Sequence, residues 1–179
     1  MDVLAQLDQL GPLLAGTVGG ISSDQLDAPT PCEDFTVRGV LEHMVGGATA
    51  FAAAFRGDTA GEADLSDPLG SFLPALTTLA ESIHGPGALE REVEAPFGTV
   101  PGETFARFVV LDGLVHGWDM ATATGQAYEP SDELVAAVQA FGEQALPPLA
   151  GSDAFGHPTE APADATPIER LAALTGRKV

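Results

Sequence analysis

One apolar segment, residues 105–123, limits most strongly how this chain can fold. Four charged or ionisable side chains interrupt it: Arg107, Asp112, His116 and Asp119. These interruptions argue against a membrane-spanning helix, which needs about 18 or more predominantly apolar residues. On a helical wheel of ~100° per residue, the two aspartates and the histidine share one stripe with aromatic and aliphatic residues. The segment therefore predicts a helix that is buried over most of its circumference and carries ionisable groups on a core-facing stripe.

Apolar residues recur at helical spacing along most of the remaining chain. The spacing and the flanking turn formers predict helices over residues 2–18, 37–56, 68–83, 101–124, 131–146 and 168–174. Thr36 and Ser131 are the expected N-caps, and Gly125 is the expected C-terminal stop of the segment described above. Residues 89–100 alternate weakly and are typical of a short hairpin or an extended crossover. Residues 151–167 are polar and rich in proline, and they predict an irregular tail.

We expect an all-α fold from this pattern. The predicted architecture is an antiparallel four-helix bundle with a short crossover or hairpin segment and a small C-terminal docking helix. The length of 179 residues suits one domain with a sizeable core, so residues 1–179 are expected to form a single domain.

The charge balance excludes several classes of partner. Seven Lys and Arg face 26 Asp and Glu, which gives a formal net charge of -19. Such a field repels a phosphate backbone and an anionic membrane surface, so we expect neither nucleic acid nor membrane as a partner. Cys32 is the single cysteine and cannot form an internal disulfide. No basic segment followed by an apolar one opens the chain, and we expect a cytoplasmic protein.

The ionisable stripe predicts a metal site. A buried, unpaired carboxylate costs several kcal/mol, and a divalent cation compensates for that cost. Asp112 and His116 are four residues apart, so both side chains can reach one ion. His43 is the histidine placed well inside another predicted helix, and we expect it to be the third ligand. Two histidines and one carboxylate leave a position for water or substrate, as in catalytic zinc sites.

Several alternatives stay open on the residues alone. Asp119, three residues after His116, could hold the second ring nitrogen of that histidine, act as a ligand itself, or pair with Arg38. The stripe could also be a buried hydrogen-bond network without a metal. Cys32 is expected to be a small buried residue in a tight loop, with a reactive thiol as the alternative. Four other residues are expected to have no part in the site: Trp118 and Phe51 in the core, and His84 and His157 in solvent.

Three segments resemble a known family. Residues 30–47 (TPCEDFTVR followed by LEHMVGG), residues 114–125 (LVHGWDMATATG) and residues 163–177 (ADATP followed by RLAALTGR) occur in the same order in the mycothiol-dependent maleylpyruvate isomerase N-terminal family. The third segment is similar to the tail of a stand-alone actinobacterial branch. The wider group is that of the DinB-like metal-binding four-helix bundles.

The resemblance implies a divalent metal, zinc or nickel, held by His43, Asp112 and His116. The isomerases of the family carry Glu where this chain has Asp112, a His in place of Gly117, and a second, C-terminal domain. The implied function is that of a metal-dependent enzyme using a low-molecular-weight thiol such as mycothiol, a transferase or isomerase acting on a small electrophile. The alternative is a non-catalytic metal- or small-ligand-binding protein, such as a stress-response accessory. No general base is assigned, and a homodimer is expected.

Overall fold

The computed structural model describes residues 1–95, 97–151 and 155–179. The described part contains six α-helices, two single-turn 3-10 helices and one two-stranded sheet. In chain order they are α1 (Val3–Gly19), η1 (Ser23–Gln25), α2 (Val37–Arg56), α3 (Pro68–Ile83), β1 (Glu92–Ala95), β2 (Gly98–Pro101), α4 (Gly102–Thr124), α5 (Asp132–Ala145), η2 (Pro147–Leu149) and α6 (Pro167–Leu174). The prediction of a predominantly helical fold is confirmed, and each predicted helix lies within two residues of its observed bounds.

Local capping explains where the long helices begin and end. The Thr36 hydroxyl accepts a hydrogen bond from the backbone N–H of Gly39 at 3.2 Å, which starts α2. Ser131 caps α5 in the same way. Gly57 and Gly125 follow α2 and α4 with φ of 75° and 70°, a left-handed conformation that glycine adopts without steric cost. The predicted caps at Thr36, Ser131 and Gly125 are therefore confirmed.

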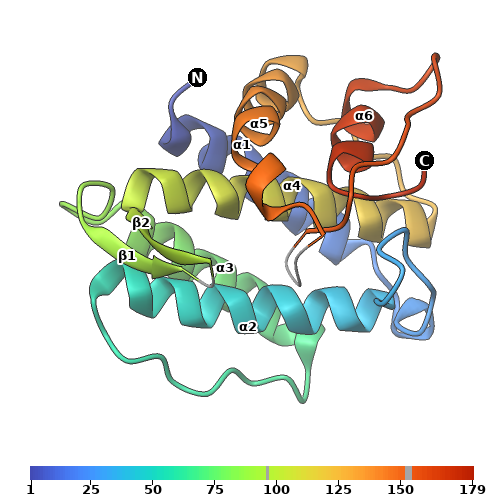
Figure 1. Ribbon diagram of the computed structural model, residues 1–179. Helices are drawn as coiled ribbons and strands as arrows, with labels where there is room; N and C mark the ends of the chain where they lie inside the picture. The colour runs from blue at the N-terminus through green and yellow to red at the C-terminus, as the bar shows by residue number, and fades with distance from the viewer. Residues whose placement is uncertain (96, 152–154) are drawn as a thin grey trace.

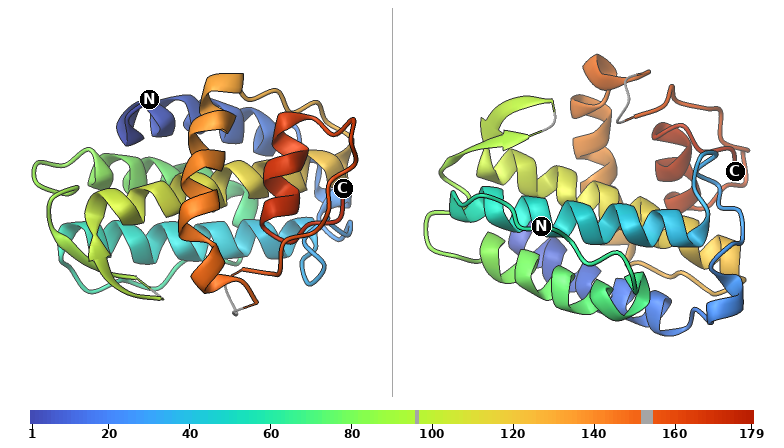
Figure 2. Two further views of the ribbon diagram at one scale, coloured as in Figure 1. Left: turned by 45° about the horizontal axis from the view of Figure 1, so that its top comes forward. Right: turned by 90° about the horizontal axis from the view of Figure 1, so that it is seen from below.

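The first four helices pack side by side. Helix α2 lies along α3 and α1 lies along α4, while contacts of α2 with α4 and of α1 with α3 complete the group. Helix α5 crosses over α4 on the opposite side from α3, and α6 packs beside α5 and against α4 (Figures 1 and 2). The C-terminal segment after α6 returns toward the end of α4.

Helix α4 lies at the centre of the molecule, in contact with α1, α2, α5, α6 and both strands. Val110, Leu111, Leu114 and Met120 point in different directions from its axis, and each is fully buried. The prediction that this helix is buried over most of its circumference is confirmed. Its ionisable residues therefore lie inside the protein, and their charges need partners there.

The predicted short hairpin is also present. Strands β1 and β2 pair antiparallel from Glu92↔Pro101 to Ala95↔Gly98, and the hairpin packs on α4 and α2. The predicted segments 89–100 and 151–167 include positions 96 and 152–154, which lie outside the described residues. Within the described part, none of the helices combines the length and the hydrophobicity that a membrane crossing requires.

Candidate metal centre

Three side chains predicted as metal ligands converge between α2 and α4. The Asp112 Oδ1 atom lies 3.4 Å from His43 Nε2 and 3.5 Å from His116 Nε2. The two imidazole rings are 4.9 Å apart between centroids, and each residue of the trio offers a ligand atom within 4.8 Å of the others. Two imidazole nitrogens and one carboxylate oxygen are donors that suit zinc and nickel, so the residues present fit a divalent ion of this kind.

Asp119 fixes the orientation of His116. Its Oδ2 atom lies 2.9 Å from His116 Nδ1, and the carboxylate is fully buried. A carboxylate only accepts hydrogen bonds, so the proton of a neutral His116 resides on Nδ1. The lone pair on Nε2 then faces Asp112 and His43, as a ligand nitrogen requires. Of the alternatives left open for Asp119, the structure favours support of His116.

The charge of Asp119 is matched by Arg177, which lies in the segment after α6. Its Nη2 donates to Asp119 Oδ2 at 2.9 Å and its Nε donates to Oδ1 at 3.4 Å. The Arg177 side chain is only 11% exposed, so this is a buried ion pair. Thr175 accepts from Nη1 through its hydroxyl and its carbonyl, which anchors the guanidinium further.

The proposed pairing of Asp119 with Arg38 is wrong. Arg38 lies at the start of α2 and faces Asp27, with 3.7 Å between Nε and Oδ1 and both side chains largely in solvent. Arg177 was missed as a site residue because it is 58 positions away from Asp119 in the chain. One sequence feature could have indicated it: Arg177 and Lys178 are adjacent basic residues in a strongly acidic sequence. Arg177 also belongs to the third segment that resembles the family, residues 163–177.

The electrostatics of the site favour the charged forms of Asp112 and His43. Burial opposes ionisation of Asp112, but the nearby His116 and a hydrogen bond with His43 outweigh it, and the pKa of the carboxyl falls below its ordinary value. The same hydrogen bond raises the pKa of His43, against the opposing effect of its partial burial. In the absence of a metal, His43 and Asp112 therefore form an ion pair that a divalent cation would replace.

A second possible group of ligands shares His116 with the first. Cys32, His116 and Asp119 also bring ligand atoms within 4.8 Å of one another. In this group Asp119 is already hydrogen-bonded to His116 Nδ1 and paired with Arg177. Burial raises the pKa of the Cys32 thiol, which disfavours the thiolate. The trio of His43, Asp112 and His116 is the better metal site, because it uses neither the paired carboxylate of Asp119 nor a thiol that burial keeps protonated.

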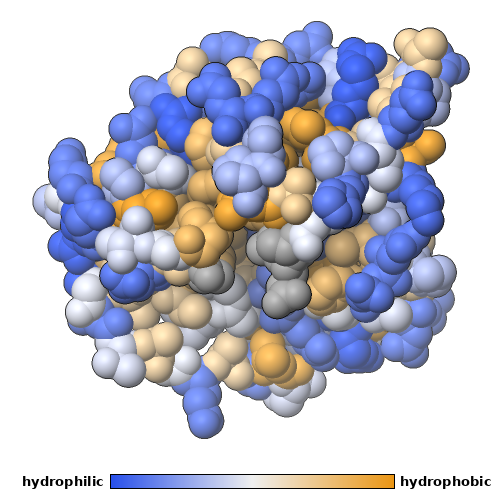
Figure 3. All heavy atoms as spheres, in the orientation of Figure 1, coloured by the Kyte–Doolittle hydropathy of each residue, from blue (hydrophilic) through white to orange (hydrophobic). Residues whose placement is uncertain are grey.

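A cavity of about 620 Å³ opens beside the trio. Helices α2 and α4, the hairpin and the C-terminal segment surround it, and Figure 3 shows hydrophobic residues gathered near the middle of this face with hydrophilic ones around them. His43, Asp112 and His116 form one part of its wall. Among the described residues, its aromatic lining consists of Phe35, Phe51, Phe97, Phe105, Phe108 and Phe155. A cavity of this size and composition is typical of a small-molecule site.

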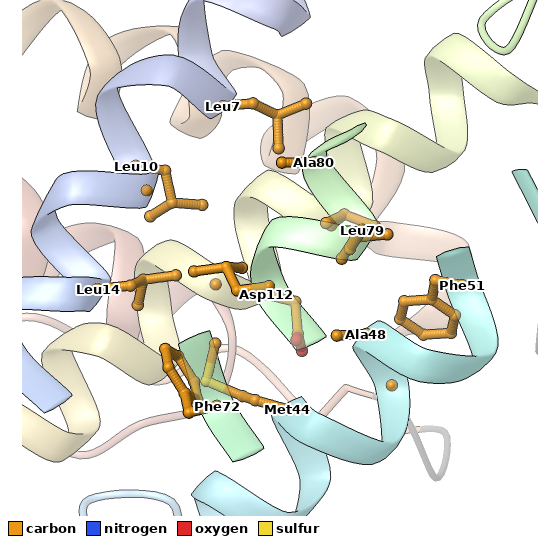
Figure 4. Close-up of a pocket in the computed structure, with 15 residues that line it drawn as sticks. Leu7, Leu10, Leu14, Met44, Ala48, Phe51, Phe72, Leu79, Ala80 and Asp112 are labelled. Atoms are coloured by element: carbon orange, nitrogen blue, oxygen red, sulfur yellow. The ribbon is translucent and has the colours of Figure 1, made fainter. Parts of the chain in front are cut away.

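Asp112 separates this cavity from the apolar core. On its other side lies a void of only about 60 Å³, lined by leucines of α1 and α3 together with Met44, Ala48 and Phe72 (Figure 4). Asp112 is the one charged residue that lines this void within the described part of the chain. The carboxylate therefore has polar partners on the side of the histidines only, and its side chain is 33% exposed.

Most residues predicted to lie outside the site do so. His84 is near the surface and faces Asp8 at 3.2 Å, His157 is exposed, and Trp118 is buried in the core. Phe51 differs from its prediction as a core residue, because it is half-buried and lines both cavities.

Gly117 accommodates a tyrosine from the loop that follows α4. A Cβ atom at Gly117 would lie 2.3 Å from the Tyr128 hydroxyl oxygen and 2.9 Å from a methyl carbon of Leu14. Burial, with a smaller contribution from Asp119, raises the pKa of the Tyr128 phenol. Its hydroxyl has no hydrogen-bond partner among the described residues. The space that a longer side chain at position 117 would need is therefore filled.

The fold and the site together define a helical protein with a His/carboxylate cluster at the wall of an internal cavity. Residues 7–121 match the family of the mycothiol maleylpyruvate isomerase N-terminal domain. The match covers more than half of the chain and includes the whole trio and Asp119, and this chain belongs to that family.

Relatives extend the similarity over the full length. Uncharacterized proteins from two strains of Mycobacterium tuberculosis are each 30% identical to this chain over 184 residues, which covers 100% of both sequences. No solved structure matches the chain. Arg177 and Phe155 lie beyond the family match, so the part of the cavity wall formed by the C-terminal segment lies outside the matched domain.

Proposed function

We propose that this protein is a DinB-like four-helix bundle that holds one divalent ion, zinc or nickel, through His43, Asp112 and His116. We further propose that it is an enzyme that uses a low-molecular-weight thiol such as mycothiol to transform a small electrophile. The observation that carries the proposal is the convergence of ligand atoms from three side chains at the wall of a 620 Å³ cavity.

The side-by-side packing of α1 to α4 supports the assignment to the bundle class. One continuous hydrophobic cluster includes residues of all six helices, which supports the proposal that residues 1–179 fold as one domain. Membership of the mycothiol maleylpyruvate isomerase N-terminal family supports a thiol as cosubstrate.

An open coordination position is what distinguishes an enzyme from a structural metal site. Asp119 is a further carboxylate that is hydrogen-bonded to a member of the trio, and its bonds to His116 and Arg177 occupy both of its oxygens. It therefore acts as a support for His116. The trio then supplies three protein ligands and leaves the side toward the cavity for an exogenous molecule.

The residues of this chain have separable tasks in the proposed reaction. A divalent ion held there would supply positive charge that lowers the pKa of a thiol sulfur in the cavity toward neutrality. Asp119 accepts a hydrogen bond from His116 Nδ1, and Arg177 donates to Asp119 and holds its carboxylate in place. The aromatic wall provides an apolar surface next to the trio.

The proposal is tested first by metal content. Wild-type protein, His43→Ala, His116→Ala and His84→Ala are reloaded with Zn²⁺ or Ni²⁺, desalted and measured by plasma mass spectrometry. His84→Ala is the matched control because it also removes a histidine that faces an aspartate, at the surface and away from the cavity. We expect about one ion per chain in wild type and in His84→Ala, and a loss of most of it in the other two variants. Less than about a tenth of an equivalent in the reloaded wild type would refute the metal site.

The thiol is tested separately on the loaded protein. With Co²⁺ or Ni²⁺ in place of zinc, a coordinated sulfur produces a near-ultraviolet charge-transfer band. Mycothiol is expected to produce this band in wild type, and its S-methylated form is not. A loaded protein that shows no band at saturating thiol would leave the metal site standing and refute the role of the thiol.

A further inference from the structure

We infer that the second substrate of this site is an uncharged aromatic compound, or one of similar apolar and planar shape, which the cavity binds in preference to an anion. The inference rests on the proposed function because it places that substrate next to the same trio. It is carried by two observations, the aromatic wall and the balance of charges around the cavity.

The aromatic wall is continuous. The ring centroids of Phe51 and Phe105 are 4.8 Å apart, those of Phe105 and Phe97 are 6.4 Å apart, and those of Phe97 and Phe108 are 4.5 Å apart. Phe155 extends the row at 6.0 Å from Phe108. Most of these pairs are edge-to-face or tilted, which leaves ring faces and edges available to a further aromatic group.

The wall lies within reach of the metal ligands. Phe105, Phe108 and Asp112 belong to one helix, α4, and Phe108 precedes Asp112 by one turn. One turn of helix corresponds to about 5.4 Å along its axis, less than the length of a bicyclic aromatic compound. A ring bound against Phe108 therefore brings a substituent on its edge next to His116 and Asp112.

The charges around the cavity disfavour an anion. Among the described lining residues, Glu33, Asp34 and Asp112 are acidic, and Arg177 is the one lysine or arginine. The guanidinium of Arg177 is already paired with the buried carboxylate of Asp119. Lys178, next to it in the chain, pairs with Glu33 at the surface.

In the metal-free protein, an anionic ligand would thus enter a cavity whose described lining offers it no free lysine or arginine. Such a ligand would bury its charge without a partner, which is unfavourable. A neutral aromatic molecule has no charge to bury and gains contact with the phenyl wall. A carboxylate clamp from lysine or arginine of the described lining would require Arg177 to leave Asp119. The lining of the metal-free cavity therefore favours a neutral ligand by charge as well as by shape.

The experiment uses metal-free protein, so that it does not depend on the metal site. The neutral fluorophore N-phenyl-1-naphthylamine serves as the probe, and 1-naphthol and 1-naphthoate compete for it as a matched neutral and anionic pair. We expect the probe to bind with an increase in fluorescence and 1-naphthol to displace it. The naphthoate should need a concentration about tenfold higher or more, the ratio that corresponds to about 1.4 kcal/mol.

Variants locate the binding. Phe97→Ala and, separately, Phe155→Ala remove half-buried rings of the wall, and each is expected to weaken probe binding by up to about tenfold. Phe141→Ala is the control, because Phe141 is also half-buried and contacts Phe108 but does not line the cavity. Circular dichroism establishes that each variant is folded.

Three outcomes would overturn the inference: no binding of the probe to folded wild type, naphthoate competing as well as naphthol, or equal loss of binding in Phe141→Ala. Failure of the metal test with normal probe selectivity would refute the proposed enzyme and leave an apolar binding cavity. A normal metal content without neutral-aromatic selectivity would refute this inference alone.

Discussion

Arg177→Met is the perturbation that tests the site most directly. It removes the charge of Arg177 and retains much of its volume, and it leaves Asp119 as a fully buried carboxylate with His116 as its remaining hydrogen-bonded partner. Removing one partner of a buried ion pair costs about 3–5 kcal/mol, because the other charge stays buried without compensation. The His116 Nδ1–H still serves Asp119, so we expect the lower part of this range, about 3 kcal/mol.

The assay is urea unfolding followed by circular dichroism, with a chelator present so that metal does not contribute. For a chain of this length, about 3 kcal/mol also corresponds to a fall of roughly 6–12 °C in Tm. Lys178→Met is the matched control: it removes the adjacent basic residue, whose partner Glu33 is at the surface, and we expect it to leave the unfolding midpoint essentially unchanged.

A double variant separates the ion pair from the packing of the long side chain. In Arg177→Met/Asp119→Asn no uncompensated charge remains, so most of the lost stability is expected to return. If Arg177→Met unfolds at the same urea concentration as wild type, the buried pair does not hold the C-terminal segment. If the double variant is as unstable as the two single losses added together, the loss comes from packing.

Two further predictions concern pH and packing. In metal-free protein, His43 has a raised pKa, so its pairing with Asp112 stabilises the fold fully below the ordinary histidine pKa of about 6.5 and less as pH rises through the folded-state value. The difference in unfolding free energy between wild type and His43→Gln should therefore be larger at about pH 6 than at about pH 9; an opposite trend would contradict the pair. Gly117→Ala should cost about 1–3 kcal/mol, because its Cβ would lie 2.3 Å from the Tyr128 hydroxyl. Gly16→Ala meets nothing within 4 Å and should instead stabilise α1 by about 0.5–1 kcal/mol in the same urea assay.

The sequence by itself determined the helices and one half of the site. Helical periodicity and caps such as Thr36 and Gly125 are local properties, so the predicted bounds agree with the structure. The spacing of Asp112 and His116 places both on one side of α4 wherever that helix packs. His43 was found because it is the histidine inside another long predicted helix, and the resemblance supported the choice.

Only the tertiary structure decided which charges meet and what shape the cavity has. Arg38 was a reasonable partner for Asp119 by sequence, yet Arg177 occupies that place, because the segment after α6 folds back over the end of α4. The aromatic wall combines residues of α2, the hairpin, α4 and the C-terminal segment. Periodicity fixes the direction of a side chain within its own helix, whereas contacts between distant segments depend on how those helices pack, and no local pattern records that packing.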